Sequence, residues 1–482
     1  MSSHLVATKP GPLRPREDVA LAERIARSVA VVDSGQSTLE DFRTWMAQRR
    51  AANQFQVERV PFADLEGWHI QEDTGNVVHH SGRFFSVEGL HVTTEPGRWR
   101  EWYQPIIKQP EVGILGILVK EFDGVLHCLM QAKMEPGNPN LLQLSPTVQA
   151  TRSNYTRVHR GAQVKYLEHF VDRGRGRVLA DVLQSEHGAW FYRKSNRNMI
   201  VETFDDVLVD EDFRWMTFGQ IAELLQQDNV VNMDSRTVLS CAPMAAVEPE
   251  DSPNAFLAAL VRSRDENALH TDVELLSWFT VERSRYDVRS ERVPLNSLPN
   301  WVRTDSAIEH EDGLYFRVLG VSVRAGNREV TSWSQPLIEP CGEGVAAFVT
   351  RRIDGVLHVL AHAKVEGGFV DTIELAPTVQ CIPANYRTSA ERPPFLDLVL
   401  SAAPERVRYS AVHSEEGGRF FNATSRYVIV EAGDYDVPLD PPAGYCWVTP
   451  GQLTSLVRHG HYLNVQARTL LACLNGMAYG TR

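Results

Sequence analysis

The chain of 482 residues contains an internal repeat, and this repeat limits the folds open to it. Residues 122–155 align without a gap to residues 353–386, with 17 identical residues among 34 positions at a constant offset of 231. Shorter matches continue on both sides with small changes of offset, as insertions in surface loops produce. They pair Glu58–Pro61 with Glu291–Pro294, Trp102 with Trp333, Gln104 with Gln335, Trp215 with Trp447, Gln220 with Gln452, Asn232 with Asn464 and Arg236 with Arg468.

Two homologous domains of about 200 residues each follow from this repeat. The segment 245–268 separates them and carries the prolines and charges of a linker before a short helical stretch. We therefore expect an N-terminal tail and helix over 1–36, a first repeat over 37–245, a linker over 246–268 and a second repeat over 269–482.

Within each copy, the patterns predict an α+β unit with a mixed sheet. A capping pattern opens a helix in each copy, Ser37 with Glu40 in the first and Thr271 with Glu274 in the second. Strands with alternating or β-branched character follow, and no regular βαβ alternation is present. The expected strands are 84–92, 113–119, 124–134 and 198–204, and the expected late helices are 217–227 and 449–459.

Charge and cysteine usage narrow the class of protein. The net charge of −12 argues against a general nucleic-acid surface, which needs a basic stripe. Apolar runs such as 112–119 are far too short to span a bilayer, and residues 1–18 lack the apolar centre of a signal peptide. The six cysteines form no C-x-x-C pair and no zinc-type spacing. We expect a reduced, cytoplasmic protein without nucleic-acid or membrane partners.

The predicted central strand of each copy separates polar from apolar side chains. Side chains alternate between the two faces of a strand, so His127, Lys133 and Glu135 share one face opposite Leu126, Cys128 and Met130. The second copy repeats the polar set as His358, Lys364 and Glu366. A polar face turned to water is the ordinary explanation. Retention of all three residues where half the neighbours differ favours a shared binding function, although common ancestry alone would also retain them.

A second set of candidates surrounds the P-T-V-Q string in each copy. Proline interrupts a strand, so this string predicts a loop or helix entry where side chains can meet a ligand. Tyr155 or Trp102 could stack on a nucleobase, and Arg197 or Arg426 could pair with a diphosphate. Core packing is the alternative for the tryptophans.

Several common chemistries have no motif here. The chain lacks G-x-G-x-x-G after a strand, the phosphate-binding G-x-x-x-x-G-K-[ST] loop, H-E-x-x-H and G-x-S-x-G. It also lacks the acidic helix R-E-x-x-x-E-E with which Nudix hydrolases hold divalent metal. We therefore expect neither a cofactor nor a metal.

The block 102–161, with Q-L-S-P-T-V-Q-A-T-R-S-N-Y at 143–155 and E-L-A-P-T-V-Q-C at 374–381, resembles the NDP-hexose 2,3-dehydratases of deoxysugar antibiotic pathways. The resemblance covers nearly the whole chain and implies a homodimer whose subunits carry two Nudix-like domains. It implies a hydro-lyase that converts dTDP-4-keto-6-deoxy-D-glucose to dTDP-3,4-diketo-2,6-dideoxy-D-glucose. An NADPH-dependent 3-ketoreductase would act next.

Such a reaction needs a base for the proton on C3, a partner for the C4 oxyanion and an acid for the departing C2 hydroxyl. Our hypothesis assigns Lys133 to the oxyanion, Glu135 or His127 to base or acid, and Tyr155 to the leaving group. The first copy is favoured as catalytic because it is richer in polar groups. The predicted nucleotide-sugar-binding residues are Trp102, Gln104, Gln149, Arg152, Asn154, Arg197, Trp333, Gln335, Lys364, Gln380, Asn385, Tyr386 and Arg426.

Two other functions remain open at this point. The chain could be a non-catalytic sensor or scaffold that binds sugar nucleotides and hands them to neighbouring enzymes. It could also be a metal-dependent nucleotide-sugar pyrophosphatase, which the missing acidic helix disfavours.

Overall fold

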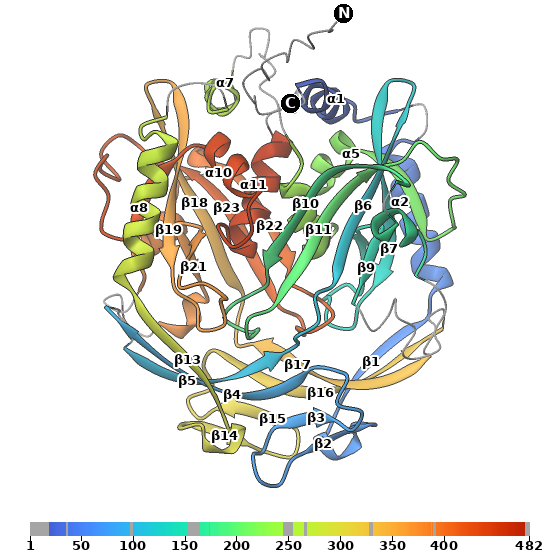
Figure 1. The fold of residues 1–482 in the computed structure, drawn as a ribbon, viewed down its shortest axis with the longest axis vertical. Coiled ribbons are helices and arrows are strands. Elements are labelled where there is room, and N and C mark those ends of the chain that lie inside the picture. The colour runs from blue at the N-terminus through green and yellow to red at the C-terminus, as the bar shows by residue number, and fades with distance from the viewer. Residues whose placement is uncertain are drawn as a thin grey trace, which may run out of the picture.

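The structure is a computed structural model that describes residues 19–34, 37–96, 100–151, 164–172, 174–243, 254–264, 268–326, 331–386, 388 and 392–477. Two large mixed sheets lie side by side above two smaller sheets, and helices fill the space between the large sheets (Figure 1). The predicted α+β class and the tandem duplication are confirmed. The likeness of each repeat to Nudix domains stays a prediction.

Each copy forms a large sheet with one parallel strand pair. In the first copy β11 runs parallel to β6, and the other neighbours are antiparallel. The first large sheet contains β10 (Arg177–Ser185), β11 (Ser195–Glu202), β6 (Ile114–Phe122), β7 (Val125–Met134), β12 (Phe213–Thr217), β8 (Leu142–Ser145) and β9 (Val148–Ala150). The second contains β22 (Val407–Ser414), β23 (Thr424–Glu431), β18 (Gly344–Ile353), β19 (Val356–Lys364), β24 (Tyr445–Val448), β20 (Glu374–Ala376) and β21 (Val379–Cys381).

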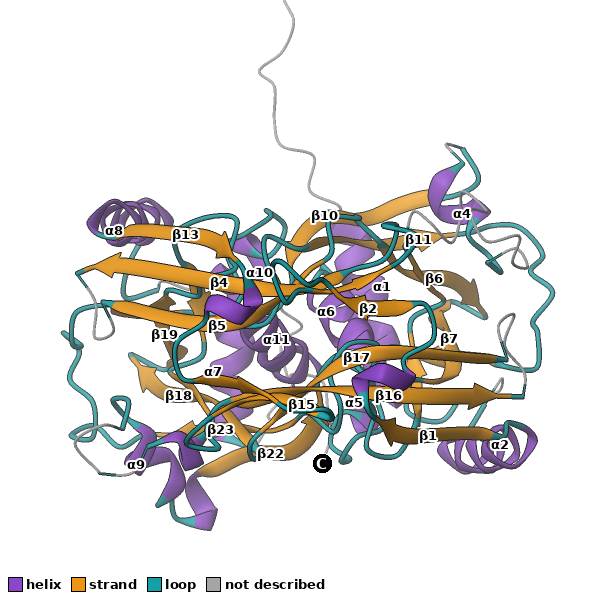
Figure 2. Cartoon of the chain, turned by 90° about the horizontal axis from the view of Figure 1, so that it is seen from below, coloured by secondary structure: helices purple, strands orange, loops and turns teal. Residues whose placement is uncertain are grey.

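The two copies exchange strands in the smaller sheets, which the sequence did not predict. Strand β1 (Phe55–Val60) of the first copy pairs with β16 (Phe316–Ala325) of the second, and β13 (Asp287–Val293) pairs with β4 (Ser86–Glu95). Seen from below, β1 and β13 lie on opposite edges of the molecule (Figure 2). The remaining small-sheet strands are β2 (Trp68–Ile70), β3 (Val77–His79), β5 (Glu101–Lys108), β14 (Trp301–Arg303), β15 (Ala307–His310) and β17 (Ser332–Pro340).

The helices that precede the exchanged strands begin with side-chain caps. Helix α8 (Asp272–Arg285) is capped by Thr271 and Glu274, as predicted. Helix α2 (Leu39–Ala52) is capped one residue later than predicted, by Thr38 and Asp41. The Ser37 hydroxyl instead accepts a hydrogen bond from Arg214 Nε at 2.8 Å, which removes it from the capping position. Helices α1 (Val19–Val29) and α7 (Ala255–Arg262) cover β7 and β19.

The core forms where the small sheet of one copy covers the large sheet of the other. Val321 and Val323 of the second copy join one buried cluster with Met134 and Leu142 of the first. Cys128 and Met130 belong to the same cluster, which confirms the predicted apolar face of the central strand. The predicted loop is confirmed at Pro146 and Thr147, which connect β8 to β9, whereas Val148 and Gln149 of the same string belong to β9.

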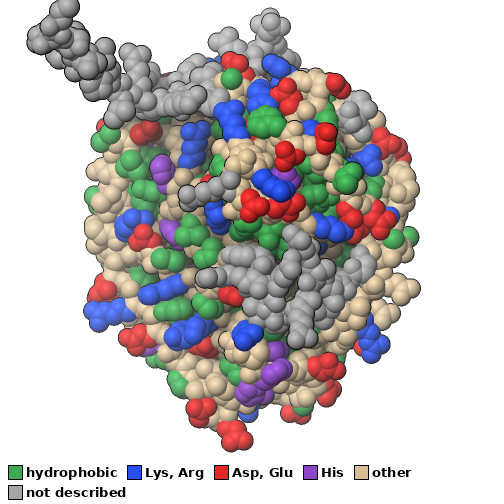
Figure 3. Space-filling model, turned by 45° about the vertical axis from the view of Figure 1, so that its right-hand side comes forward, with side chains coloured by type: hydrophobic (Ala, Val, Ile, Leu, Met, Phe, Trp, Pro, Cys, Tyr) green, Lys and Arg blue, Asp and Glu red, His purple; other side chains and the backbone are tan. Residues whose placement is uncertain are grey.

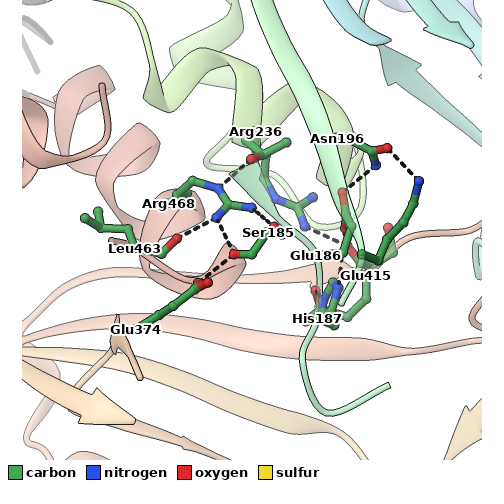
Figure 4. Close-up of polar contacts among 12 residues, drawn as sticks. Ser185, Glu186, His187, Asn196, Arg236, Glu374, Glu415, Leu463 and Arg468 are labelled. Carbon is green, nitrogen blue, oxygen red and sulfur yellow. Dashed lines mark hydrogen bonds and ion pairs between the residues drawn. The ribbon is translucent and has the colours of Figure 1, made fainter. Parts of the chain in front are cut away.

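Two fully buried arginines join the copies at the centre, on α6 (Met233–Ser240) and α11 (Val465–Met477). Arg236 donates to the carbonyl of Ser414 at 2.7 Å, and Arg468 donates to the carbonyl of Ser185 at 2.5 Å. Arg468 also donates to the Thr237 hydroxyl of the opposite helix at 2.7 Å. Figure 4 shows the bonds from Arg468 to Ser185 and Leu463. Each guanidinium satisfies backbone oxygens that are shut off from water, so both arginines fasten one repeat to the other.

The late helices α5 (Phe218–Leu224) and α10 (Pro450–Leu456) confirm the predicted helical segments. Within the described ranges, no helix is long and apolar enough to cross a membrane. On the face that Figure 3 shows, both acidic and basic side chains are present. The remaining short helices are α4 (Glu168–Val171) and α9 (Leu396–Leu400).

We predict that Arg236→Ala lowers the free energy of unfolding by about 3 to 5 kcal/mol, because it leaves the buried carbonyls of Val231 and Ser414 without donors. Urea unfolding followed by circular dichroism measures this loss. Arg289→Ala, at an exposed arginine, is the matched control and changes stability by less than about 0.5 kcal/mol. Equal effects of the two substitutions would contradict the fastening role of Arg236.

Candidate active site

A cavity of about 560 Å³ opens at one end of β7 in the first copy. Most of its lining comes from the first copy, and a short loop of the second copy supplies the rest. The lining residues are Gly82, Arg83, Phe84, Phe85, Gln109, Pro110, Glu111, Gly113, Leu115, Lys133, Glu135, Gln149, Ala150, Thr151, Lys194, Asn196, Asp234, Glu416, Gly418 and Arg419.

Lys133, Glu135 and Gln149 form a hydrogen-bonded unit on the cavity wall. The ammonium of Lys133 donates to Gln149 Oε1 at 2.5 Å and lies 3.4 Å from Glu135 Oε1. The Gln149 amide donates to the same Glu135 oxygen at 2.8 Å. Gln149 also accepts from the Ser145 hydroxyl, which in turn accepts from Asn232. This network fixes the rotamers and stabilises the ionised form of the Glu135 carboxylate.

The second copy contributes the loop between β22 and β23 to this cavity. The Gly137 amide donates to the Gly417 carbonyl at 2.7 Å, and the Asn422 amide donates to the Gly137 carbonyl at 2.7 Å. A Cβ on Gly137 would lie 1.7 Å from the Phe420 carbonyl oxygen. The close approach brings Glu416 and Arg419 to the wall of the first copy's cavity.

Arg419 is held from two sides at the cavity wall. Its Nε donates to Gln109 Oε1 at 3.1 Å, and its guanidinium lies 4.2 Å from the centre of the Phe85 ring. Arg83, two residues before Phe85, adds a second positive charge to the lining. The cavity therefore presents fixed cationic charge beside its carboxylates.

Burial and neighbouring charges shift the pKa values of Lys194, Asp234 and Glu416. The Lys194 ammonium donates to Asn196 at 2.9 Å, and burial lowers the pKa of Lys194. Burial, together with the nearby carboxylates Glu416 and Glu135, raises the pKa of Asp234 well above its usual range. Burial also raises the pKa of Glu416 to about 7. Across the described residues, no three His, Cys, Asp or Glu side chains are arranged to hold a metal ion.

The second copy keeps the same scaffold but loses most of these charges. Lys364 lies 3.4 Å from Glu366, and Gln380 donates to Glu366 at 2.8 Å, as in the first copy. Around this unit, the aligned positions differ. Arg83, Lys194, Asp234, Glu416 and Arg419 correspond to Leu314, Ala423, Gln466, His187 and Trp190.

Trp190 illustrates how the residue differences between the two copies change the second site. Where Arg419 lies over Phe85, Trp190 packs against Phe316 and Phe420 in an apolar cluster, at ring-centre distances of 6.5 and 4.6 Å. His187 stacks on Trp190 and bonds to Glu415 at 2.9 Å. Aromatic packing thus replaces the cation and carboxylate of the first site.

Comparison with known proteins identifies the family. The family model for NDP-hexose 2,3-dehydratase matches residues 39–242 and again residues 272–474. The chain belongs to the NDP-hexose 2,3-dehydratase family. Three curated relatives are named dTDP-4-dehydro-6-deoxy-alpha-D-glucopyranose 2,3-dehydratase. The first, from Amycolatopsis orientalis, is 58% identical over 99% of this chain and 98% of its own. Those from Saccharopolyspora spinosa and Streptomyces violaceoruber are 53% and 51% identical, over 94% and 90% of this chain and 95% and 96% of their own.

In this dehydratase-family chain, the cavity contains three of the residues predicted from the sequence, namely Lys133, Glu135 and Gln149. The structure does not bring His127 to them. His127 lies at the opposite end of β7, where its Nδ1 bonds to the Val125 carbonyl at 2.9 Å and burial lowers its pKa. Period-2 alternation placed these residues on one face correctly but did not account for their separation along the strand.

Most predicted nucleotide-sugar-binding residues lie elsewhere in the structure. Arg197 and Arg426 are paired with Asp181 and Glu343. Trp102 packs against Leu90, Val92 and Ile106. Trp333 packs against the core cluster of the first copy. Gln104 and Gln335 donate hydrogen bonds to the carbonyls of Ala189 and Gly418. Lys364 and Gln380 belong to the Lys-Glu-Gln unit of the second copy, and Asn385 and Tyr386 lie at a 3₁₀ turn of that copy.

Three predicted residues, Arg152, Asn154 and Tyr155, lie outside the described residues. Six charged residues of the lining were missed by sequence reasoning, Arg83, Glu111, Lys194, Asp234, Glu416 and Arg419. Aligning the two copies gives a signal for them, because the residue aligned with each one in the other copy is of a different type. Finding that they share one cavity required the strand exchange and the loop docking.

We predict that Gly137→Ala destabilises the protein by about 3 kcal/mol or more, because the added methyl meets the Phe420 carbonyl and must displace the loop that carries Glu416. Gly326→Ala is the matched control, since the nearest atoms to its Cβ, in Gln54, lie at 3.6 Å. Denaturant unfolding of both variants measures the difference. If Gly137→Ala is as stable as the control, the docking described here is wrong.

Proposed function

We propose that this chain removes the C2 hydroxyl of dTDP-4-keto-6-deoxy-D-glucose as water and forms dTDP-3,4-diketo-2,6-dideoxy-D-glucose. The names of the relatives support the substrate and the reaction. We further propose that the first copy's cavity performs the reaction. One observation carries this choice: charged residues line the cavity beside the Lys-Glu-Gln unit of the first copy, and the positions aligned with Arg83, Lys194 and Arg419 are the uncharged Leu314, Ala423 and Trp190.

Charge in the cavity suits a nucleoside diphosphate. Arginine pairs well with phosphate oxygens, and both Arg83 and Arg419 border the first cavity. Their counterparts Leu314 and Trp190 carry no charge. We assign the two arginines to the diphosphate, with the sugar directed inward toward Lys133.

The Lys-Glu pair suits removal of the proton on C3. The C4 ketone acidifies this proton, and the charge that develops on the C4 oxygen needs a fixed donor. We assign Glu135 as the base at C3 and Lys133 as the cation at the neighbouring C4 oxygen. Their 3.4 Å separation fits groups that act on adjacent sugar atoms. The C3 carbanion then expels the C2 hydroxyl, and the resulting enol becomes the 3-ketone, so the sugar undergoes no net redox change.

We predict that Lys133→Ala lowers kcat by about 10²- to 10³-fold, because the oxyanion loses its charged partner. Lys364→Ala, the matched change in the second copy, keeps kcat within several-fold of the unaltered protein. Purified protein is incubated with dTDP-4-keto-6-deoxyglucose, and a 3-ketoreductase with NADPH traps the product. Mass spectrometry of the trapped sugar then measures the loss of one water. Loss of turnover in Lys364→Ala alone would move the reaction to the second copy.

The cellular setting is proposed from chemistry. The vicinal diketone product is electrophilic, which supports a following NADPH-dependent 3-ketoreductase. The cysteines among the described residues, all six of the chain, are free thiols, which supports a reducing compartment such as the cytoplasm. A homodimer is proposed from the family resemblance, and light scattering of the purified chain tests it.

A further inference from the structure

Elimination of a hydroxyl requires a proton for the departing oxygen, and neither Lys133 nor Glu135 as assigned above supplies it. The candidate named from sequence, Tyr155, lies outside the described residues. The described cavity wall holds three further carboxyl groups that the proposed reaction does not use, those of Glu111, Asp234 and Glu416. They differ in what surrounds them.

Glu416 is positioned by the second copy against the Lys-Glu unit of the first. The residue after it, Gly417, lies so close that a Cβ there would be 2.9 Å from Glu135 Cβ and 2.2 Å from Asn138 Oδ1. The backbone bonds between Gly137 and the loop 417–422 fix this approach. Glu416 therefore faces the cavity beside the proposed base although 281 residues separate the two in the chain.

The carboxyl groups of Glu135 and Glu416 have opposite environments. Glu135 accepts a hydrogen bond from Gln149 and lies beside the Lys133 ammonium, which favours a negative charge. Among the described residues, no donor bonds to the Glu416 carboxyl group. One ionised and one protonated carboxyl on the same cavity wall is the arrangement that acid–base pairs use.

We propose that Glu416 is the general acid of the reaction, donating its proton to the C2 oxygen as the C2–O bond breaks. Glu135 takes the C3 proton, the electron pair of that bond forms the C2–C3 double bond, and the C2–O electron pair leaves with the oxygen, which departs as water. Each chain would thus need both repeats for one reaction. The inference rests on the proposed dehydration at the first copy's cavity.

The charges that face Glu416 come from several elements. Glu186 and Glu135 raise its pKa, Arg419 and Lys194 lower it, and burial is the largest influence, with a resulting pKa of about 7. Asp234 adds a further neighbouring carboxyl from α6. A group with this pKa is protonated below about pH 7 and loses its proton above it. Water loss should therefore decline as pH rises through about 7.

Replacing the leaving group tests the assignment. In the 2-deoxy-2-fluoro analogue of dTDP-4-keto-6-deoxyglucose, fluoride leaves without being protonated. We expect Glu416→Gln to lower the rate of water loss from the natural substrate by about 10²- to 10⁴-fold. Fluoride release from the analogue, followed with an ion-selective electrode, should stay within several-fold of the unaltered protein. Glu135→Gln should lower both rates, and Glu366→Gln, the matched change in the second copy, should lower neither.

Each result decides between specific alternatives. Equal loss of water and fluoride release in Glu416→Gln would overturn the acid role and indicate a structural one, and unchanged rates with both substrates would also overturn it. Should Glu416→Gln fail to fold, the unaltered protein gives the same test, because only water loss should decline through pH 7. If the unaltered protein releases neither water nor fluoride, the proposed function itself fails, which a defect confined to Glu416 cannot produce.

Discussion

The structure depends on a reciprocal contact in which each repeat docks a glycine loop onto the other. Gly137 exchanges backbone hydrogen bonds with Gly417 and Asn422, and Gly368 does the same with Gly188 and Arg193. Glycine is needed at both turns, because a Cβ on Gly137 or Gly368 would lie within 1.8 Å of a carbonyl oxygen of the opposite repeat. These contacts, the exchanged strands and the buried arginines make the two repeats one body.

The same contact explains how duplicated sequence can give two unlike sites. Each site takes a loop from the opposite repeat, so one loop can change without altering the other site's own strand. The loop given to the first copy carries Glu416 and Arg419, whereas the loop given to the second carries His187 and Trp190. In both copies, hydrogen bonds of the Lys-Glu-Gln unit also join the short strand that carries the glutamine, β9 or β21, to the lysine and glutamate at the end of the central strand.

Local signals in the sequence predicted the elements well. The alternating faces of β7, the capped helix after Thr271 and the late helices depend on nearest neighbours along the chain, and all were confirmed. The cap of α2 was misplaced by one residue because Arg214, 177 residues away, engages Ser37. Strand exchange could not be predicted, since β1 has the same alternating pattern whichever repeat it joins.

The candidate site was only partly predictable for the same reason. Lys133, Glu135 and Gln149 lie within 17 consecutive residues of one repeat, so their grouping was visible in the sequence. Glu416 and Arg419 reach the cavity through contacts between repeats, which no periodicity encodes. Arg197 lies outside the lining of this cavity and pairs with Asp181 on the neighbouring strand, a pairing that depends on the register of β10 and β11.

The central claim is that one cavity, built from both repeats, binds the activated sugar. A crystal structure with a non-reactive dTDP-sugar tests this most directly. We predict the sugar between Lys133 and Glu416, with the diphosphate near Arg83 and Arg419. A sugar bound only beside Lys364 and Trp190, with the first cavity taking no part, would contradict the account.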